Sequence, residues 1–531
     1  MAFTKTARTS LYVFAGTLTS RILGFVRILI LATTLGFFRL NDSYSLSNEI
    51  PNMMYELVLG SLISSTLLPF FVKQYKQKNK KDDQSIFTFM VFASLALTLL
   101  SLIFAPAIAS IVTSLNSTSS ANTQRELVLF FLYCFLPQIF FYALTSVMQT
   151  YLAARHKFIA SSFAPVINNI IVISMLFYVK HLLSSFGDNP SDALLKKVEY
   201  TLGFGTTFGV IAISLIVGIA YVKGGGKFKR GLVRTRAIKE MLQQSKWMVS
   251  YAIVNQIALF AIISIANKTE GGVSRYLSAW AFFQLPHGLL AMTIMTIAIP
   301  KISHSMNHDI KNEEGIQPNQ ITIETRSLVK QSGTAIVMLI SVVSALGISI
   351  ARPFMTIILG HGEISISQAK LAGNVLIGFL IFSSAFSFYV FVVRLANLVG
   401  KTKGIFKINV IQNSLNIILA ILLIKIWPAI GLSIAFSMSY FLIMPLALKM
   451  VSKNFLTPAL NGKATSIVGI TSICGGLLGF IAGHGIDNIY LSTVIGLLTC
   501  LIILGIGSHF AREEIISLFR IFYKKSIPTE R

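Results

Sequence analysis

Long apolar runs recur from residue 11 to residue 510, and they constrain the fold more than any other feature of this chain. The hydrocarbon core of a bilayer is about 30 Å thick, which takes about 20 consecutive apolar residues of helix to cross. Backbone polar groups find no water at that depth, so a spanning segment must be helical. Hydrophobic residues make up 54% of the 531 residues and charged residues only 12%. We therefore predict an all-α polytopic membrane protein.

About fourteen runs are long enough to span a bilayer. An even number of spans places both termini on the same side of the membrane. The first run is longer than the apolar region of a signal peptide, so we expect it to remain as the first span. The predicted spans lie near residues 11–37, 44–75, 85–113, 126–153, 158–180, 202–222, 238–267, 275–303, 328–350, 367–398, 404–427, 429–450, 464–484 and 489–510.

The distribution of basic residues orients these spans. With both termini in the cytoplasm, most of the 45 lysines and arginines fall in cytoplasmic segments such as "KQYKQKNKK" (73–81) and "KGGGKFKRGLVRTRAIK" (223–239). This asymmetry follows the positive-inside rule. The net charge of +25 is then a topology signal with an attraction to anionic lipid, which excludes nucleic acid as the partner.

Short similar segments recur in the same order in the two halves of the chain. "IPN" (50–52) is matched by "LPH" (285–287), and "NIIVISMLFYV" (169–179) by "NIILAILLIKI" (416–426). Two six-helix lobes in parallel orientation, plus a C-terminal helix pair, explain this order and would place a substrate between the lobes. The predicted parts are an N-lobe (1–222), a basic cytoplasmic linker (223–237), a C-lobe (238–450), the last helix pair (451–510) and a cytoplasmic tail (511–531).

The first span contains two arginines, Arg21 and Arg27, within "TSRILGFVRILILATTLG". An arginine at the bilayer centre costs about 2.5–3.5 kcal/mol on insertion scales, so each must have a partner. One interpretation is a structural ion pair with a neighbouring helix. The favoured interpretation is a cavity in which both guanidiniums hold an anion. Gly16, Ser20 and Gly24 follow four-residue spacing and predict a small, polar, cavity-facing side of this helix.

The second predicted span carries acidic residues that can balance these arginines. Glu49, Asn52 and Glu56 recur at helical spacing, and Asp42 precedes them at the outer boundary. Pro51 removes a backbone donor between them and predicts a kink. The acids either hold the arginines when no substrate is bound or bind a coupling cation, and the first alternative is favoured.

Other polar positions in the spans are fewer. Arg394 either snorkels to the inner surface or contacts the anion at the inner mouth of the cavity. Asn255, Gln256 and Gln284 add neutral polar groups. No catalytic residues are identified: "GGGK" (224–227) lacks the spacing of a phosphate-binding loop. Cys134, Cys474 and Cys500 lie inside apolar segments and are predicted to be small core residues. They lack metal-ligand spacing, so no metal is expected. Without a cofactor or an ATPase site, transport would draw on a monovalent cation gradient or the membrane potential.

Several segments together resemble the MurJ (MviN-type) family of lipid II flippases. They are "SRILGFVR" (20–27), "ND" (41–42), "IPN" (50–52), "YLAARHKFIASSFAPVINNI" (151–170), "NQI" (255–257), "QLPHGLLA" (284–291), "IPKIS" (299–303) and "RLANLVGKTKGIFK" (394–407). The resemblance covers nearly the whole chain. It implies fourteen helices, the fold of the multidrug/oligosaccharidyl-lipid/polysaccharide exporter superfamily, and a lipid-tail groove at residues 451–510.

The resemblance also implies roles for individual residues. Arg21 and Arg27 match arginines that serve the diphosphate of lipid II in the family, Ser20 and Asp42 match polar family positions, and Arg394 matches an arginine at the end of the tenth helix. Other family cations are absent here. Many members carry an acidic residue where this chain has Ile28 and two arginines where it has Tyr55 and Glu56, and a cationic position appears here as Ala281. In this respect the chain is similar to an actinobacterial-looking branch.

The sequence thus predicts a flippase of the bacterial cytoplasmic membrane that moves lipid II to the outer leaflet by alternating access. Its expected partners are the polyprenyl-diphosphate lipid, membrane lipids and cell-wall synthesis proteins. Three alternatives remain open: a flippase for another polyprenyl-diphosphate oligosaccharide, a cation-coupled drug antiporter of the same superfamily, and a non-transporting cell-wall scaffold.

Overall fold

The structure is a computed structural model that describes residues 5–56, 67, 71, 80–116, 121–185, 191–227, 235–310, 322–486 and 488–512. Every regular element in these ranges is a helix, which confirms the all-α class. Eleven described helical segments are long and apolar enough to cross a membrane, and two bent helix pairs raise this number to thirteen. The predicted span 44–75 lies partly outside the described residues, so the number fourteen stays a prediction.

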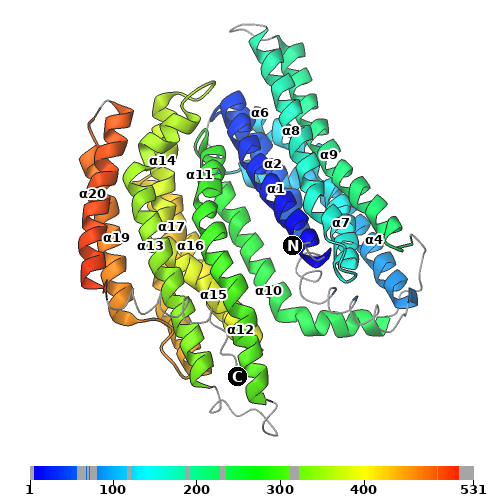
Figure 1. Cartoon of the computed structure of the whole chain (residues 1–531). Helices are drawn as coiled ribbons and strands as arrows, with labels where there is room; N and C mark the ends of the chain where they lie inside the picture. The colour runs from blue at the N-terminus through cyan, green and yellow to red at the C-terminus, as the bar shows by residue number, and fades with distance from the viewer. Residues whose placement is uncertain are drawn as a thin grey trace. The chain divides into compact units, whose positions relative to one another are not determined.

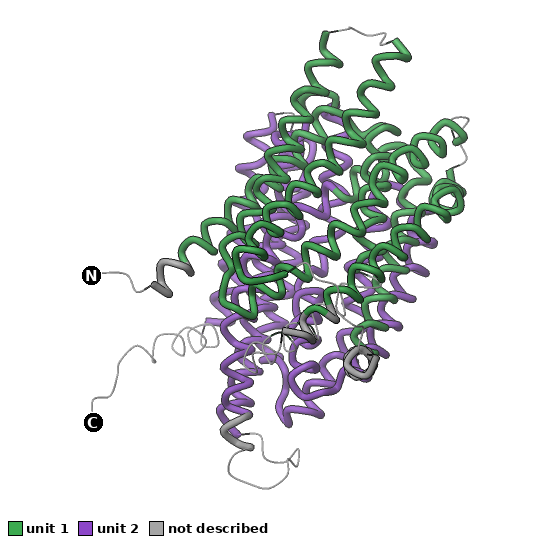
Figure 2. The backbone as a smooth tube through the Cα atoms, turned by 90° about the vertical axis from the view of Figure 1, so that its right-hand side faces the viewer, with its two compact units in different colours: residues 1–277, 361–364 green, residues 278–360, 365–531 purple. Residues whose placement is uncertain are grey.

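The chain divides into two compact units (Figure 2). Unit 1 contains Met1–Leu277 with His361–Ile364, and unit 2 contains Ser278–Gly360 with Ser365–Arg531. The division falls at residue 277, after the seventh predicted span, whereas the predicted lobes meet at the linker 223–237. The predicted lobes therefore stay a prediction. Residues 228–234 of that linker and 513–531 of the predicted tail lie outside the described residues.

The helices of unit 1 are α1 (Lys5–Leu35), α2 (Arg39–Tyr55), α4 (Lys80–Ile103), α5 (Ala105–Thr113), α6 (Ala121–Phe135), α7 (Gln138–Ala153), α8 (Ile159–Ser184), α9 (Asp192–Lys223) and α10 (Thr235–Ala266). The helix α11 (Gly272–Pro286) begins in unit 1 and continues into unit 2. The helix α8 packs between α1 and α9, and α2 packs on α6 (Figure 1). Apolar side chains of α2, α6, α8 and α9 form one of the cores of unit 1.

The remaining helices of unit 2 are the π-helical turn η3 (His287–Ala291), α12 (Met292–Ile310), α13 (Ile323–Leu359), α14 (Ile366–Leu380), α15 (Ser383–Leu398), α16 (Thr402–Ile426), α17 (Gly431–Leu442), α18 (Met444–Phe455), α19 (Gly462–Gly483) and α20 (Ile489–Phe510). The 37-residue helix α13 is their common neighbour, because α14, α15, α19 and α20 all pack on it. Figure 1 shows α19 and α20 side by side next to α13.

Two spans are broken by a bend. The axes of α4 and α5 differ by 59°, and Pro106 in the first turn of α5 provides the cause, since proline cannot donate to the preceding turn. The axes of α14 and α15 differ by 49° without a proline. There the Ser437 hydroxyl donates to the Gly378 carbonyl at 2.6 Å, which supplies a hydrogen bond next to the break. The helix α2 continues through Pro51 to Tyr55, and the predicted kink at Pro51 stays a prediction.

Glycines on α19 bring it close to two neighbouring helices. A Cβ atom placed on Gly479 would lie 2.6 Å from the Gly496 carbonyl oxygen of α20 and 2.8 Å from the Ser349 side chain of α13. A Cβ atom on Gly476 would lie 3.1 Å from the Ala345 backbone. Small residues allow such close backbone approach between membrane helices, where burial from water supplies no driving force. Cys474 on the same helix is exposed, which corrects its prediction as a core residue.

This packing predicts that Gly479→Leu destabilises unit 2. The added side chain has no room between α13 and α20, and overpacking typically costs about 1–3 kcal/mol. We expect a lower melting temperature for the purified protein in detergent, measured by intrinsic fluorescence. Gly505→Leu on α20 is the matched control, because a Cβ atom there meets nothing within 4 Å. Equal melting temperatures of the two variants would contradict the packing role of Gly479.

Candidate functional site

The helix α1 carries both predicted arginines of unit 1. Arg21 is exposed, and Arg27 is half-buried. Arg27 follows Arg21 by six positions, so they lie about 9 Å apart along the helix axis. The two arginines therefore have different surroundings on the same helix.

Arg27 interacts with polar groups from two other helices. Its guanidinium acts electrostatically on Glu49 and Tyr44 of α2 and on Tyr142 of α7. The two phenols are held in place, because Tyr44 Oη is 2.8 Å from Thr206 Oγ1 and Tyr142 Oη donates to Gln138 Oε1 at 3.2 Å. Arg27, Glu49, Tyr44 and Tyr142 are called the Arg27 cluster below. It joins one cation and one carboxylate with two phenols whose hydroxyls are already hydrogen-bonded to Thr206 and Gln138.

The other predicted members of the acidic stripe on α2 lie apart from Arg27. Asn52 Nδ2 donates to the Asn48 carbonyl at 3.4 Å, within its own helix. Glu56 is exposed, and the described structure pairs its carboxylate with neither Arg21 nor Arg27. Glu49 is therefore the acidic residue of the described part of α2 that faces Arg27.

Asp42 is fully buried and binds the start of α11. Its Oδ2 accepts from the Gly271 backbone N–H at 2.7 Å, and its Oδ1 accepts from the N–H and the hydroxyl of Ser274, both at 2.8 Å. A carboxylate at a helix N-terminus satisfies backbone donors that have no partner within the helix. Gly271 has a φ of 69°, which lies in the left-handed region that favours glycine. Asp42 thus anchors the α10–α11 turn.

A network of neutral amides holds the same turn from its other side. Asn267 Oδ1 accepts from Gln124 Nε2 at 2.8 Å, and Asn267 Nδ2 donates to the Val112 carbonyl at 3.1 Å. The Arg39 guanidinium donates to the Asn267 carbonyl and to Asn116 Oδ1, each at 3.3 Å. This network ties the turn to α2, α5 and α6. The sequence analysis did not identify it, because its members are far apart in the chain.

The small-residue face of α1 has a packing role that the sequence analysis did not predict. Gly16 is buried, and a Cβ atom there would lie 2.8 Å from the Phe163 ring of α8. Asn169 of α8 donates to the Ser20 carbonyl at 3.0 Å, and a Cβ atom on Gly24 would lie 3.5 Å from the same amide. This face packs against α8, so the prediction that it lines a cavity is wrong. A role for the Ser20 side chain at an anion stays a prediction.

Unit 2 contains Arg394, the third predicted arginine. It is half-buried on α15, where its guanidinium donates to the Met292 sulfur at 3.3 Å. It also acts electrostatically on His287, whose Nδ1 lies 3.0 Å from the Ser387 hydroxyl. Both partners of Arg394 come from the π-helical turn and the start of α12. Gln284 lies one turn before His287 and is half-buried.

The remaining predicted polar residues lie on α10. Asn255 and Gln256 are half-buried there, in unit 1. The described structure does not join either of them to Arg21 or Arg27 by a direct interaction. Among the described residues, no three His, Cys, Asp or Glu side chains come together as metal ligands.

The tyrosines of the Arg27 cluster are the site residues that the sequence analysis missed. Tyr44 lies two residues after Asp42 and Tyr142 lies on α7, and no motif or spacing marked either of them. Tyr142 could be found only from the packing of α7 against α2.

Comparisons with known proteins agree with this architecture. The family profile described as lipid II flippase MurJ matches residues 31–499. A probable lipid II flippase MurJ of Rhizobium meliloti (strain 1021) is 24% identical over 370 residues, which cover 68% of this chain and 64% of that protein. A probable lipid II flippase MurJ of Rickettsia prowazekii (strain Madrid E) is 24% identical over 433 residues, or 79% of each chain. The chain therefore spans slightly less than two thirds of the Rhizobium meliloti relative.

Solved structures show the same fold at low sequence identity. A structure described as lipid II flippase MurJ in an inward closed conformation has a TM-score of 0.73 at 20% identity, and the match covers 95% of this chain and 100% of that chain. An inward-facing multidrug resistance MATE family transporter of the MOP superfamily has a TM-score of 0.61 at 14% identity, with 82% and 96% covered. These matches confirm the predicted fold.

The contacts of Asp42 predict that Asp42→Ala destabilises the protein. The substitution leaves two buried N–H groups and a hydroxyl without their acceptor, and each buried unsatisfied group costs about 1–3 kcal/mol. We expect a clearly lower melting temperature in detergent and faster hydrogen exchange at residues 271–275. The control is Asp192→Ala, since Asp192 is exposed in the first turn of α9. Unchanged exchange at residues 271–275 would rule out the anchoring role.

Proposed function

The chain belongs to the lipid II flippase MurJ family, and from that premise we propose that it carries lipid II from the inner to the outer leaflet of the bacterial cytoplasmic membrane by alternating access. The observation that supports this most directly is the Arg27 cluster. A half-buried guanidinium on an apolar helix interacts electrostatically with one carboxylate and two tyrosines. Such a group suits an anion that must cross the membrane with its charge neutralised.

The diphosphate of lipid II is the anion that Arg21 and Arg27 would bind. A guanidinium forms paired, charge-assisted hydrogen bonds to phosphate oxygens, which a lysine ammonium cannot reproduce. Arg21 is exposed and has no partner among the described residues, so it can receive the headgroup first. Arg27 lies further along the helix and interacts electrostatically with Tyr44 and Tyr142, whose hydroxyls would turn from Thr206 and Gln138 to donate to the same oxygens. Arg394, in unit 2, stays a candidate for an anion contact of its own.

Glu49 is the residue that would compete with the diphosphate for Arg27. Its carboxylate interacts electrostatically with the guanidinium in the described structure. When a diphosphate binds, the second anion next to Arg27 must be displaced or protonated, because like charges repel strongly at low dielectric. After release, Glu49 would pair with Arg27 again. Asp42 is unsuited to this role, because three donors already occupy its carboxylate.

The polyprenyl tail would lie against the last two helices. Their outward faces carry exposed apolar side chains, including Leu478 and Ile481 of α19 and Leu498 and Ile502 of α20. These faces are compatible with a lipid tail that remains in the hydrocarbon region while the headgroup crosses. We propose that both termini are cytoplasmic and that a monovalent cation gradient or the membrane potential supplies the energy. Cell-wall synthesis proteins are the proposed protein partners.

Depletion of the protein provides the test of this function. Lipid II should accumulate in the inner leaflet, and an assay for headgroups on the outer surface should show their loss. Accumulation of a different polyprenyl-diphosphate intermediate would identify another substrate. Resistance to cationic drugs on overexpression, without a wall defect on depletion, would instead indicate an antiporter.

The proposed diphosphate contact predicts that Arg27→Ala fails to support growth when the wild-type protein is depleted. Losing charge-assisted hydrogen bonds worth about 1.5–3 kcal/mol each should weaken lipid II binding at least tenfold. Binding of lipid II to the purified protein in nanodiscs measures this directly. Arg27→Lys should recover only part of the affinity. Arg125→Ala, at an exposed arginine of α6, is the control. Wild-type affinity in Arg27→Ala would exclude the contact.

The competition with Glu49 predicts a different result for Glu49→Gln. The variant keeps the shape of the side chain but removes its negative charge, so Arg27 loses its competing anion. We expect lipid II to bind severalfold more tightly and to be released more slowly, which lowers the rate of flipping in proteoliposomes. Glu126→Gln, at an exposed position of α6, should leave both quantities unchanged. Weaker binding in Glu49→Gln would mean that the carboxylate supports the substrate instead.

A further inference from the structure

Glu56 is a charged residue of unit 1 that the proposed diphosphate contact does not use. It directly follows the last residue of α2, and its side chain is exposed. The described residues place no cation beside its carboxylate. A carboxylate within a predicted membrane span is costly unless it meets water or a positive charge. Glu56 is therefore available to a cation that arrives with a substrate.

Glu56 lies on the same side of α2 as Glu49 of the Arg27 cluster. It follows Glu49 by seven positions, close to two full turns, which corresponds to about 10 Å along the helix axis. Glu49 is the residue of α2 that interacts with Arg27. With the proposed cytoplasmic N-terminus, α1 runs outward and α2 runs back toward the cytoplasm. Glu56 then lies on the cytoplasmic side of Arg27, where the headgroup enters.

Two tyrosine rings connect these two charges. The Tyr142 ring of α7, which interacts electrostatically with Arg27, has its centroid 6.1 Å from the centroid of the Tyr55 ring of α2. Tyr55 in turn interacts electrostatically with its neighbour Glu56. A continuous series of contacts within unit 1 thus leads from a guanidinium, over two half-buried aromatic rings, to a carboxylate.

The side chains of α7 hold both rings in place. Tyr55 Oη donates to Ser146 Oγ at 2.6 Å, and Tyr142 Oη donates to Gln138 Oε1 at 3.2 Å. Neither of these partners is charged. The surface therefore has a positive charge at one end, a negative charge at the other, and fixed neutral rings between them.

The negative end suits an ammonium group better than a metal ion. An ammonium carries three donors and can form a charge-assisted hydrogen bond with a single carboxylate. A hard metal ion takes about six or more oxygen ligands. The hydroxyl next to Glu56 is that of Tyr55, which is already bound to Ser146. A single exposed carboxylate in these surroundings matches an amino group at the end of a flexible chain.

We propose that Glu56 binds a free amino group of the transported headgroup, so that the site selects lipid-linked precursors whose peptide carries a positively charged amine. The diphosphate is held at Arg27 and the amine at Glu56, and the sugars lie between them along Tyr142 and Tyr55. This inference rests on the proposed function, because it names a second recognised group of the same headgroup. A precursor without the amine keeps the contact at Arg27 and loses the one at Glu56.

Binding of two forms of lipid II to the purified full-length protein in nanodiscs tests the proposal. One form has a lysine with a free ε-amino group in its peptide, and the other is the same molecule acetylated at that nitrogen. We expect the wild-type protein to bind the acetylated form about fivefold more weakly, the upper end of what an exposed ion pair contributes. Glu56→Gln should bind both forms equally, with the affinity that the wild-type protein has for the acetylated form.

The matched control is Glu126→Gln, at the exposed position of α6, which should keep the wild-type preference. Retained binding of the acetylated form by Glu56→Gln shows that this variant is folded. Equal affinity of the wild-type protein for the two forms, or an unchanged preference in Glu56→Gln, would overturn the proposal and leave lipid II flipping in place.

Flipping assays in proteoliposomes separate the remaining outcomes. If Glu56→Gln abolishes a sodium or proton dependence of flipping equally for both forms, Glu56 binds a coupling cation and the proposal is wrong. If the wild-type protein neither binds nor flips either form, the proposed function fails, and the selection of the amine fails with it.

Discussion

The proposed transport site is organised around the electrostatic interaction of Arg27 with Glu49. A charged group in an apolar span needs a partner within the protein, because the low dielectric around it offers no other compensation. The partner must also be replaceable if the cation is to bind a substrate. Glu49 can meet both needs. Its carboxylate compensates the charge of Arg27, and it can give way to another anion while Tyr44 and Tyr142 still interact with the guanidinium.

The packing of α1 makes this interaction possible. Gly16, Ser20 and Gly24 lie against α8, which fixes how α1 is rotated about its own axis. Arg27 follows Ser20 by seven residues, close to two full turns, so this packing also sets the side of α1 from which its side chain interacts with Glu49. At the far end of α2, Asp42 satisfies the first donors of α11, and the Asn267 network holds the same turn. Two acids on one helix thus have opposite roles, one anchored by three donors and the other facing a cation.

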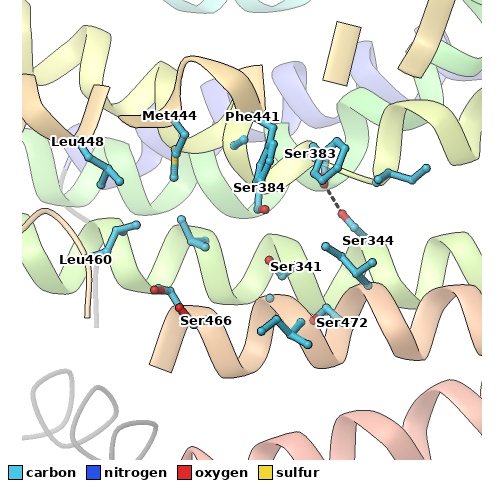
Figure 3. A pocket seen from close by; sticks show the side chains of 18 of the residues that line it. Ser341, Ser344, Ser383, Ser384, Phe441, Met444, Leu448, Leu460, Ser466 and Ser472 are labelled. Atoms are coloured by element: carbon cyan, nitrogen blue, oxygen red, sulfur yellow. Dashed lines mark hydrogen bonds between the residues drawn. The ribbon is translucent and has the colours of Figure 1, made fainter. Parts of the chain in front are cut away.

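Small residues have two effects in unit 2. On one side of α19, Gly476 and Gly479 let α13 and α20 approach to backbone contact. On another side, Gly469 leaves free space, which contributes to a cleft of about 690 Å³ between α13, α18 and α19 (Figure 3). Close packing and an open cleft therefore arise from the same residue type on one helix, according to whether a neighbouring helix is present. The broken span α14–α15 contributes the opposite wall.

The sequence by itself determined the fold class, the family and the presence of two cations in the first span. These follow from local properties: apolar run length, charge distribution and contiguous motifs. It also identified Glu49 as a counter-charge through helical spacing. Tertiary structure alone decided which acid faces Arg27, that Tyr44 and Tyr142 join it, and that the small face of α1 packs against α8. Periodicity places residues on a common face of a helix, but which neighbour covers that face depends on contacts between segments far apart in the chain.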